Sequence, residues 1–152
     1  MTLLTADICF KAFGAPDKES SMTVLDIHPE LHIKVIPNHI YCNKAMVKPL
    51  TEALHNVIAR GCTMDIRTWD GCFNIRSTRG ASGIPSLHSW GLAIDLNAAW
   101  NPLGKQPTMH KDLVSCFTDA GFDWGGHWSR PDGMHFQLTK ETLDLYNGTD
   151  NN

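Results

Sequence analysis

Two short segments of the chain alternate apolar side chains with small or polar ones, which is the pattern of a β-strand with one buried face. Residues 91–96 place three aliphatic side chains on one face and Asp95 on the other. Residues 134–138 repeat the pattern, with His135 and Gln137 opposite the apolar side chains. If the two strands are neighbours in a sheet, the carboxylate of Asp95 and the imidazole of His135 stand on the same open face.

The rest of the chain mixes helical and strand patterns without a regular alternation of strand and helix. Helices are predicted over residues 6–13, 110–120 and 140–146 and between Asn43 and Gly61, and strands over residues 32–36, 64–68, 72–76, 91–97 and 134–139. Loops are predicted over residues 77–89, 98–109 and 124–133. This mixture favours an α+β fold with a mainly antiparallel sheet and flanking helices.

Two of these predictions depend on one or two residues each. Pro49 lies inside the helical pattern that follows Asn43, so it either kinks this helix or marks a start nearer Lys48. The dipeptide Asp70-Gly71 tolerates the positive φ angles of a tight turn, and it therefore predicts a hairpin between the strands on either side of it.

The size and charge of the chain narrow its class. With 152 residues, 42% of them hydrophobic, we expect a single domain over residues 1–152, with an N-terminal arm at 1–22 and a disordered tail at 147–152. The net charge of −3 and the lack of a Lys/Arg cluster disfavour nucleic acid or an anionic membrane as a partner. No apolar run has the length of a signal peptide core or of a membrane span, so we expect synthesis in a cytoplasm.

Cysteine usage argues against both a disulfide framework and a cysteine-rich zinc site. The five cysteines are odd in number and scattered, and they form no CxxC pair. They are Cys9, Cys42, Cys62, Cys72 and Cys116. We predict buried free thiols.

A different donor set suits zinc. His88 precedes the first strand, so His88, Asp95 and His135 together supply three ligands and leave a fourth position for water, as in catalytic zinc sites. Asp132, on the loop entering the second strand, is a candidate general base and acid. Each residue also has an ordinary interpretation, as a hydrogen-bonded histidine, a strand-end cap or a turn former; the combination on one face favours the metal.

The same residues carry a resemblance to a known family. Its motifs are Ser86-x-His88-x-x-Gly91-x-Ala93-x-Asp95, Trp124-Gly125-Gly126-x-Trp128 and Asp132-x-x-His135-Phe136. They resemble the zinc D-alanyl-D-alanine carboxypeptidases and L-alanyl-D-glutamate endopeptidases of peptidoglycan, which share the hedgehog/DD-peptidase fold, and most of all small single-domain phage endolysins. The resemblance runs from about residue 43 to 138. It implies one Zn²⁺ per chain on His88, Asp95 and His135, with Asp132 as catalytic acid and base.

The resemblance also suggests substrate contacts. In such enzymes an arginine upstream of the first histidine steadies a substrate carboxylate or the developing oxyanion. Arg79 and Arg76 are both candidates, and Arg79 is favoured as the catalytic one because it leads directly into the site loop. Ser86, His127 and Trp128 are the candidate substrate-binding residues. A local turn explains Ser86 equally well, whereas a solvated loop position for His127 and packing under loops for Trp128 are the more ordinary interpretations.

The sequence thus predicts a zinc metallopeptidase that hydrolyses the stem peptides of peptidoglycan. We interpret it as a monomeric phage endolysin of the L-alanyl-D-glutamate type, made in the host cytoplasm and acting on the cell wall after release. One alternative is a D-alanyl-D-alanine carboxypeptidase, since the difference lies in how the loops at 98–109 and 124–133 close the cleft. Others are a non-catalytic, hedgehog-like zinc-binding module and a virion structural protein without metal.

Overall fold

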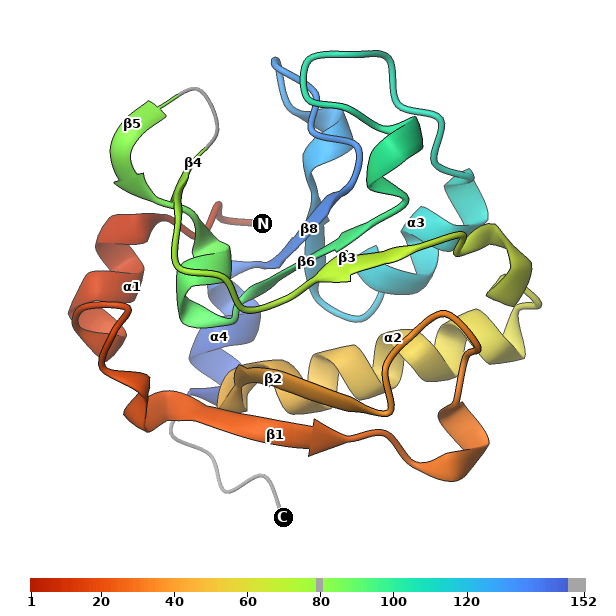
Figure 1. The fold of residues 1–152 in the computed structure, drawn as a ribbon, viewed down its shortest axis with the longest axis horizontal. Helices are drawn as coiled ribbons and strands as arrows, with labels where there is room; N and C mark the ends of the chain where they lie inside the picture. Colours follow the sequence, from red (N-terminus) through yellow and green to blue (C-terminus); the bar gives the residue numbers. More distant parts are fainter. Residues whose placement is uncertain (79–80, 148–152) are drawn as a thin grey trace.

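The computed structural model describes residues 1–78 and 81–147 and contains helices and strands in mixed order (Figure 1). The α-helices of these residues are α1 (Ala6–Phe13), α2 (Val47–Ala59), α3 (Lys111–Thr118) and α4 (Lys140–Tyr146). The strands are β1 (Met22–Asp26), β2 (His39–Asn43), β3 (Trp69–Gly71), β4 (Ser77–Thr78), β5 (Ala81–Pro85), β6 (Ala93–Leu96), β7 (Phe122–Trp124) and β8 (His135–Leu138). Short 3-10 helices join many of them. No helix of the described residues is both long and apolar enough to cross a membrane.

The centre of the molecule is a four-stranded sheet in the order β3-β6-β8-β7, in which every neighbouring pair is antiparallel. Two smaller antiparallel pairs accompany it: the β1–β2 ribbon at the bottom of Figure 1 and the β4–β5 hairpin at its upper left. Helix α3 packs against α2 and β7. The predicted α+β fold with a mainly antiparallel sheet is confirmed.

The two central strands hold the alternation that the sequence shows. Ile94 and Leu96 of β6 and Phe136 and Leu138 of β8 are completely buried in the core. Burying each such side chain contributes roughly 1.5–3 kcal/mol to folding. Their neighbours on the other face are also buried, because the segments around that face cover it.

The helix after Asn43 begins in two stages. The side chain of Asn43 accepts a hydrogen bond from the backbone N–H of Ala45 and opens a 3-10 turn, and α2 starts at Val47. Pro49 is therefore the third residue of α2, within the first turn, where backbone N–H groups have no partner inside the helix. Of the two alternatives for Pro49, a kink or a helix start nearer Lys48, the structure shows the second.

The predicted strand at 32–36 is wrong. This segment is a turn that follows the 3-10 helix Pro29–Leu31, and the strands β1 and β2 lie on either side of it. Its buried residues are Ile33 and Ile36, three positions apart. That spacing suits a turn and not the two-residue period of a strand.

The predicted hairpin around Asp70-Gly71 is also wrong. Asp70 and Gly71 are part of β3, which pairs with β6. The Asp70 carboxylate accepts hydrogen bonds from the Thr68 hydroxyl and from the backbone N–H of Ala98, so it connects β3 to the 3-10 helix Ala98–Trp100 that follows β6. The actual hairpin, β4–β5, lies inside the segment that was expected to be a loop.

Other predictions are confirmed. Helices α1 and α4 have the predicted bounds, and β6 and β8 lie within the predicted strands. All five cysteines are buried free thiols. Of the tail predicted at 147–152, only Asn147 lies among the described residues.

Candidate metal centre

Strand pairing brings the first two candidate ligands together. In the β6–β8 register, Asp95 stands directly opposite His135. His88 arrives from the 3-10 helix Leu87–Trp90, which ends at Gly91 in the left-handed conformation and leads into β6. The segment between the two ligands His88 and Asp95 thus turns back on itself.

The three side chains meet at the spacing of one metal ion. Asp95 Oδ1 lies 3.1 Å from His88 Nε2 and 3.4 Å from His135 Nδ1, and the three donor atoms are all within 4.8 Å of one another. Ligands about 2.0–2.1 Å from a tetrahedral zinc ion are themselves about 3.3 Å apart. The structure thus brings His88, Asp95 and His135 together. The two distances from Asp95 match this spacing, so the group could hold such an ion.

Hydrogen bonding orients His88 for this role. Its Nδ1 lies 2.7 Å from the backbone carbonyl oxygen of Cys72. A carbonyl oxygen only accepts, so Nδ1 carries the hydrogen and Nε2 presents its lone pair to the Asp95 side of the group. Metal-binding histidines characteristically have such a partner on the other ring nitrogen.

The electrostatics of the group favour a bound cation. Burial opposes the ionisation of Asp95, but the hydrogen bonds and charges of His135 and His88 outweigh it and place the pKa of Asp95 below its usual range. Burial likewise lowers the pKa of His135, yet the hydrogen bond and the charge of Asp95 outweigh this effect, so that pKa is raised. An anionic carboxylate therefore sits between two imidazoles and attracts positive charge.

Asp132 lies beside this group in a cavity of about 330 Å³. Its backbone N–H donates to the carbonyl of Gly125, and its carbonyl accepts from the N–H of His135. A Cβ at Gly125 would come within 2.6 Å of the Asp132 carbonyl oxygen, so only glycine permits this approach. The negative charge of Asp132 also contributes to the raised pKa of His135, behind the stronger effects of Asp95 and of a Gln137 hydrogen bond.

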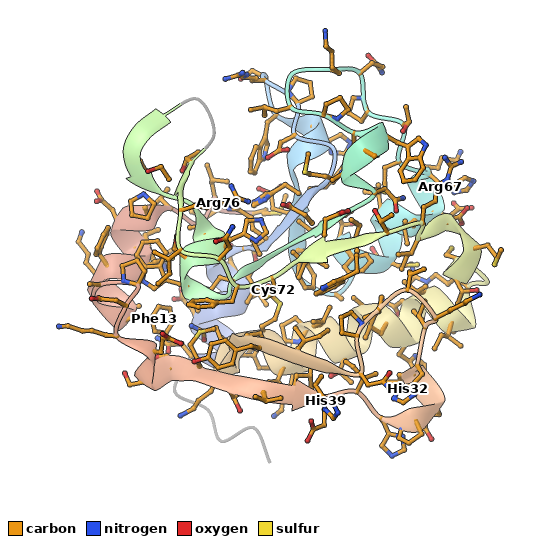
Figure 2. The ribbon with its side chains drawn as sticks, viewed as in Figure 1. Phe13, His32, His39, Arg67, Cys72 and Arg76 are labelled. Carbon is orange, nitrogen blue, oxygen red and sulfur yellow. The ribbon has the colours of Figure 1, made fainter. Side chains whose placement is uncertain are left out.

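Of the two candidate arginines, Arg76 is the one whose position is known. Its Nη2 lies 3.5 Å from Asp95 Oδ2, and it also lines the cavity. Figure 2 places Arg76 and Cys72 on the segment that joins β3 to β4. Arg79, which the sequence favoured, lies outside the described residues, so its role stays a prediction.

The predicted substrate-binding residues have different surroundings. Ser86 and Trp128 line the cavity, and the Trp128 ring lies 5.4 Å from that of His135. Ser86 also caps the turn that carries His88, since its hydroxyl accepts from the His88 N–H. His127 is not among the residues that line this cavity; it is exposed, with its ring edge-on to Trp124.

Two features of the site have no counterpart in the predictions. Residues 3–6 of the N-terminal arm line the cavity, and Gln137 contacts His135. The strand alternation put Gln137 on the face of His135, which was the signal available for it. Nothing local in the sequence indicates that the N-terminal arm reaches this face.

Comparison with known proteins supports the chemistry of this group. Residues 79–138 match the model of a family described as D-alanyl-D-alanine carboxypeptidase. The predicted resemblance to this family is confirmed over residues 79–138. The matching segment contains the three candidate ligands and Asp132.

Among solved structures, the L-Ala D-Glu endopeptidase ChiX of Serratia marcescens is similar to this chain. The alignment has 19% sequence identity and a TM-score of 0.41, and it covers 81% of this chain and 86% of the other. None of the curated proteins matches at a significant level.

Proposed function

We propose that this chain is a zinc-dependent peptidase that cleaves the stem peptides of bacterial peptidoglycan. One observation carries the proposal: His88, Asp95 and His135 converge to within 4.8 Å at a cavity, inside a segment that matches a peptidase family. Two imidazoles and one carboxylate are donors that zinc accepts, and three protein ligands are the number found in catalytic sites.

When bound, zinc supplies a Lewis acid that polarises a substrate carbonyl and makes water a stronger nucleophile at neutral pH. The chain supplies the proton transfers. Asp132 lines the cavity beside His135, where its carboxylate takes a proton from the attacking water and passes it to the leaving amine.

Positive charge near the reacting carbonyl stabilises the negative charge that develops there. Arg76, which lines the same cavity, is in place for this task, and Arg79 remains the second candidate. Ser86 and Trp128 are proposed to contact the peptide from the cavity wall, and His127 from its outer edge.

The bond that we propose is the one between L-alanine and D-glutamate, in a phage endolysin that acts after release from the host cytoplasm. The motif resemblance to small phage lysis enzymes supports this choice. The second candidate is removal of a terminal D-alanine, which the description of the matching family favours.

A digest of purified peptidoglycan, with products identified by mass spectrometry, tests these proposals. The endopeptidase releases stem peptides that begin with D-glutamate, whereas the carboxypeptidase removes single D-alanine residues. A chelator should abolish either reaction, and zinc should restore it. Digestion that persists in the chelator would exclude the metal mechanism, and a zinc-loaded but inactive wild type would favour the hedgehog-like binding module.

A further inference from the structure

Gln137 joins His135 to a residue at the other end of the chain. Its side-chain NH₂ donates to the backbone carbonyl of Leu4 at 2.9 Å, and its Oε1 lies 2.9 Å from His135 Nε2. Leu4, His135 and Gln137 are all buried. All three residues also line the cavity, but their small exposed fractions limit how far water competes for these bonds.

The Leu4 carbonyl decides the direction of both bonds. A backbone carbonyl only accepts, so the amide of Gln137 must turn its NH₂ toward Leu4 and its oxygen toward His135. The oxygen in turn only accepts, so His135 Nε2 must donate a hydrogen. The lone pair of His135 is then left on Nδ1, the atom that lies 3.4 Å from Asp95.

The carbonyl of Leu4 is itself held in place. The Thr2 N–H donates to the Glu141 carboxylate at 2.7 Å, and the Thr2 carbonyl accepts from the Lys140 N–H at 3.1 Å. On the other side, the Thr5 hydroxyl caps α1, and the Leu4 side chain is part of the core. The arm is thus anchored on both sides of Leu4.

We propose that Gln137 is a positioning residue that uses the anchored Leu4 carbonyl to hold His135 in the Nε2–H tautomer, with Nδ1 free for the metal. The inference rests on the metal site of the proposed function. According to this proposal, residues 2–5 help to orient a metal ligand, although they lie far outside residues 79–138, the segment that matches the peptidase family. The opposite tautomer would direct an N–H at the ion and could not ligate it.

The test replaces Gln137 by methionine, which keeps the volume and removes both hydrogen bonds. A matched control is Asn56→Leu, because Asn56 also donates an amide hydrogen to a backbone carbonyl, that of Cys116 at 3.0 Å, between α2 and α3. We expect Gln137→Met to weaken zinc binding by about 10- to 100-fold, the usual effect of losing a partner of a ligating histidine. Asn56→Leu should leave zinc affinity at the wild-type value.

The second readout is the ¹⁵N NMR signature of the His135 ring in metal-free protein at alkaline pH. The wild type should show one tautomer, with hydrogen on Nε2, and Gln137→Met a mixture. A single unchanged tautomer together with unchanged zinc affinity in Gln137→Met would overturn the proposal.

A third variant, Gln137→Glu, covers the case in which Gln137→Met does not fold. Its carboxylate still accepts from Nε2–H, so the tautomer should persist, while the second oxygen meets the Leu4 carbonyl and lowers stability. Loss of the tautomer in this variant would overturn the proposal. Neither readout uses peptidase activity, so an inactive wild type would remove the proposed function and still leave the role of Gln137 open to measurement.

Discussion

Gly91 stands between two of the proposed zinc ligands and has no room for a side chain. Its φ is +67°, in the left-handed region, and a Cβ there would come within 2.6 Å of both the Asn43 backbone N and Met22 Cε. The contact with Asn43 is fixed on both sides, since Asn43 N–H donates to the Gly91 carbonyl and Asn43 Nδ2 donates to the carbonyl of Trp90. Gly61 offers a comparison: its φ is +71°, but nothing lies within 4 Å of its added Cβ.

Substituting each glycine by alanine distinguishes the cost of backbone strain, present at both positions, from the cost of steric overlap, present only at Gly91. Alanine in the left-handed region costs about 1–2 kcal/mol, which is the whole expected effect of Gly61→Ala. In Gly91→Ala the same strain is joined by an overpacking cost of about 1–3 kcal/mol, because a backbone atom cannot move aside as a flexible side chain can. We therefore expect Gly91→Ala to lower the free energy of unfolding by about 2–5 kcal/mol.

Urea denaturation of both metal-free variants measures this difference. For a chain of this size, each kcal/mol corresponds to about 2–4 °C in Tm, so the two variants should also differ clearly in thermal unfolding. Gly91→Ala should in addition bind zinc more weakly, since a shift at this turn moves His88 relative to Asp95. Equal losses of stability in the two variants would refute the steric argument.

Three further predictions concern the site itself. Asp132→Asn should lower kcat by about 100-fold or more through loss of the acid and base, with the zinc content measured by mass spectrometry unchanged; loss of zinc would instead make Asp132 a ligand. Arg76→Met should reduce the rate of peptide cleavage by about 10- to 100-fold, the usual effect of losing a hydrogen bond from a charged group. The control Arg67→Met, at a side chain that lies over the Trp100 ring, should leave the rate unchanged. Equal rates in the two variants would contradict the proposed role of Arg76 at the reacting carbonyl. Zinc binding should release a proton from His135, because the hydrogen bond and charge of Asp95 outweigh the effect of burial and raise the pKa of His135. Zinc affinity should therefore rise with pH up to that pKa and then level off. Titration calorimetry in buffers of different ionisation heat would detect the released proton, whereas a pH-independent zinc affinity would count against His135 as a ligand.

Local patterns in the sequence determined the helices near both ends of the chain and the character of the two central strands. Helices α1 and α4 have caps and apolar spacings that a few neighbouring residues define, and they appear with the predicted bounds. In β6 and β8, the alternation of side chains decided which residues share the face of Asp95 and His135. Both are short-range properties of the backbone, so they can be read without knowing the fold.

Local patterns failed where a tertiary contact decided the outcome. Asp70-Gly71 has the composition of a hairpin turn, but the Asp70 carboxylate bonds to the N–H of Ala98 and the dipeptide is part of β3. The segment at 32–36 is apolar enough for a strand, but a strand forms only where another segment of the chain pairs with it. In the structure this segment is a turn between β1 and β2. Short apolar segments are ambiguous until their neighbours are known.

The sequence by itself thus determined which residues could ligate a metal, because imidazole and carboxylate chemistry and strand periodicity are properties of single residues and short segments. Only the tertiary structure decided that Asp95 faces His135 across one register, that Arg76 reaches the same carboxylate, and that Leu4 orients Gln137. These contacts join residues far apart in the chain. Their formation depends on how the whole core packs, and no local spacing encodes it.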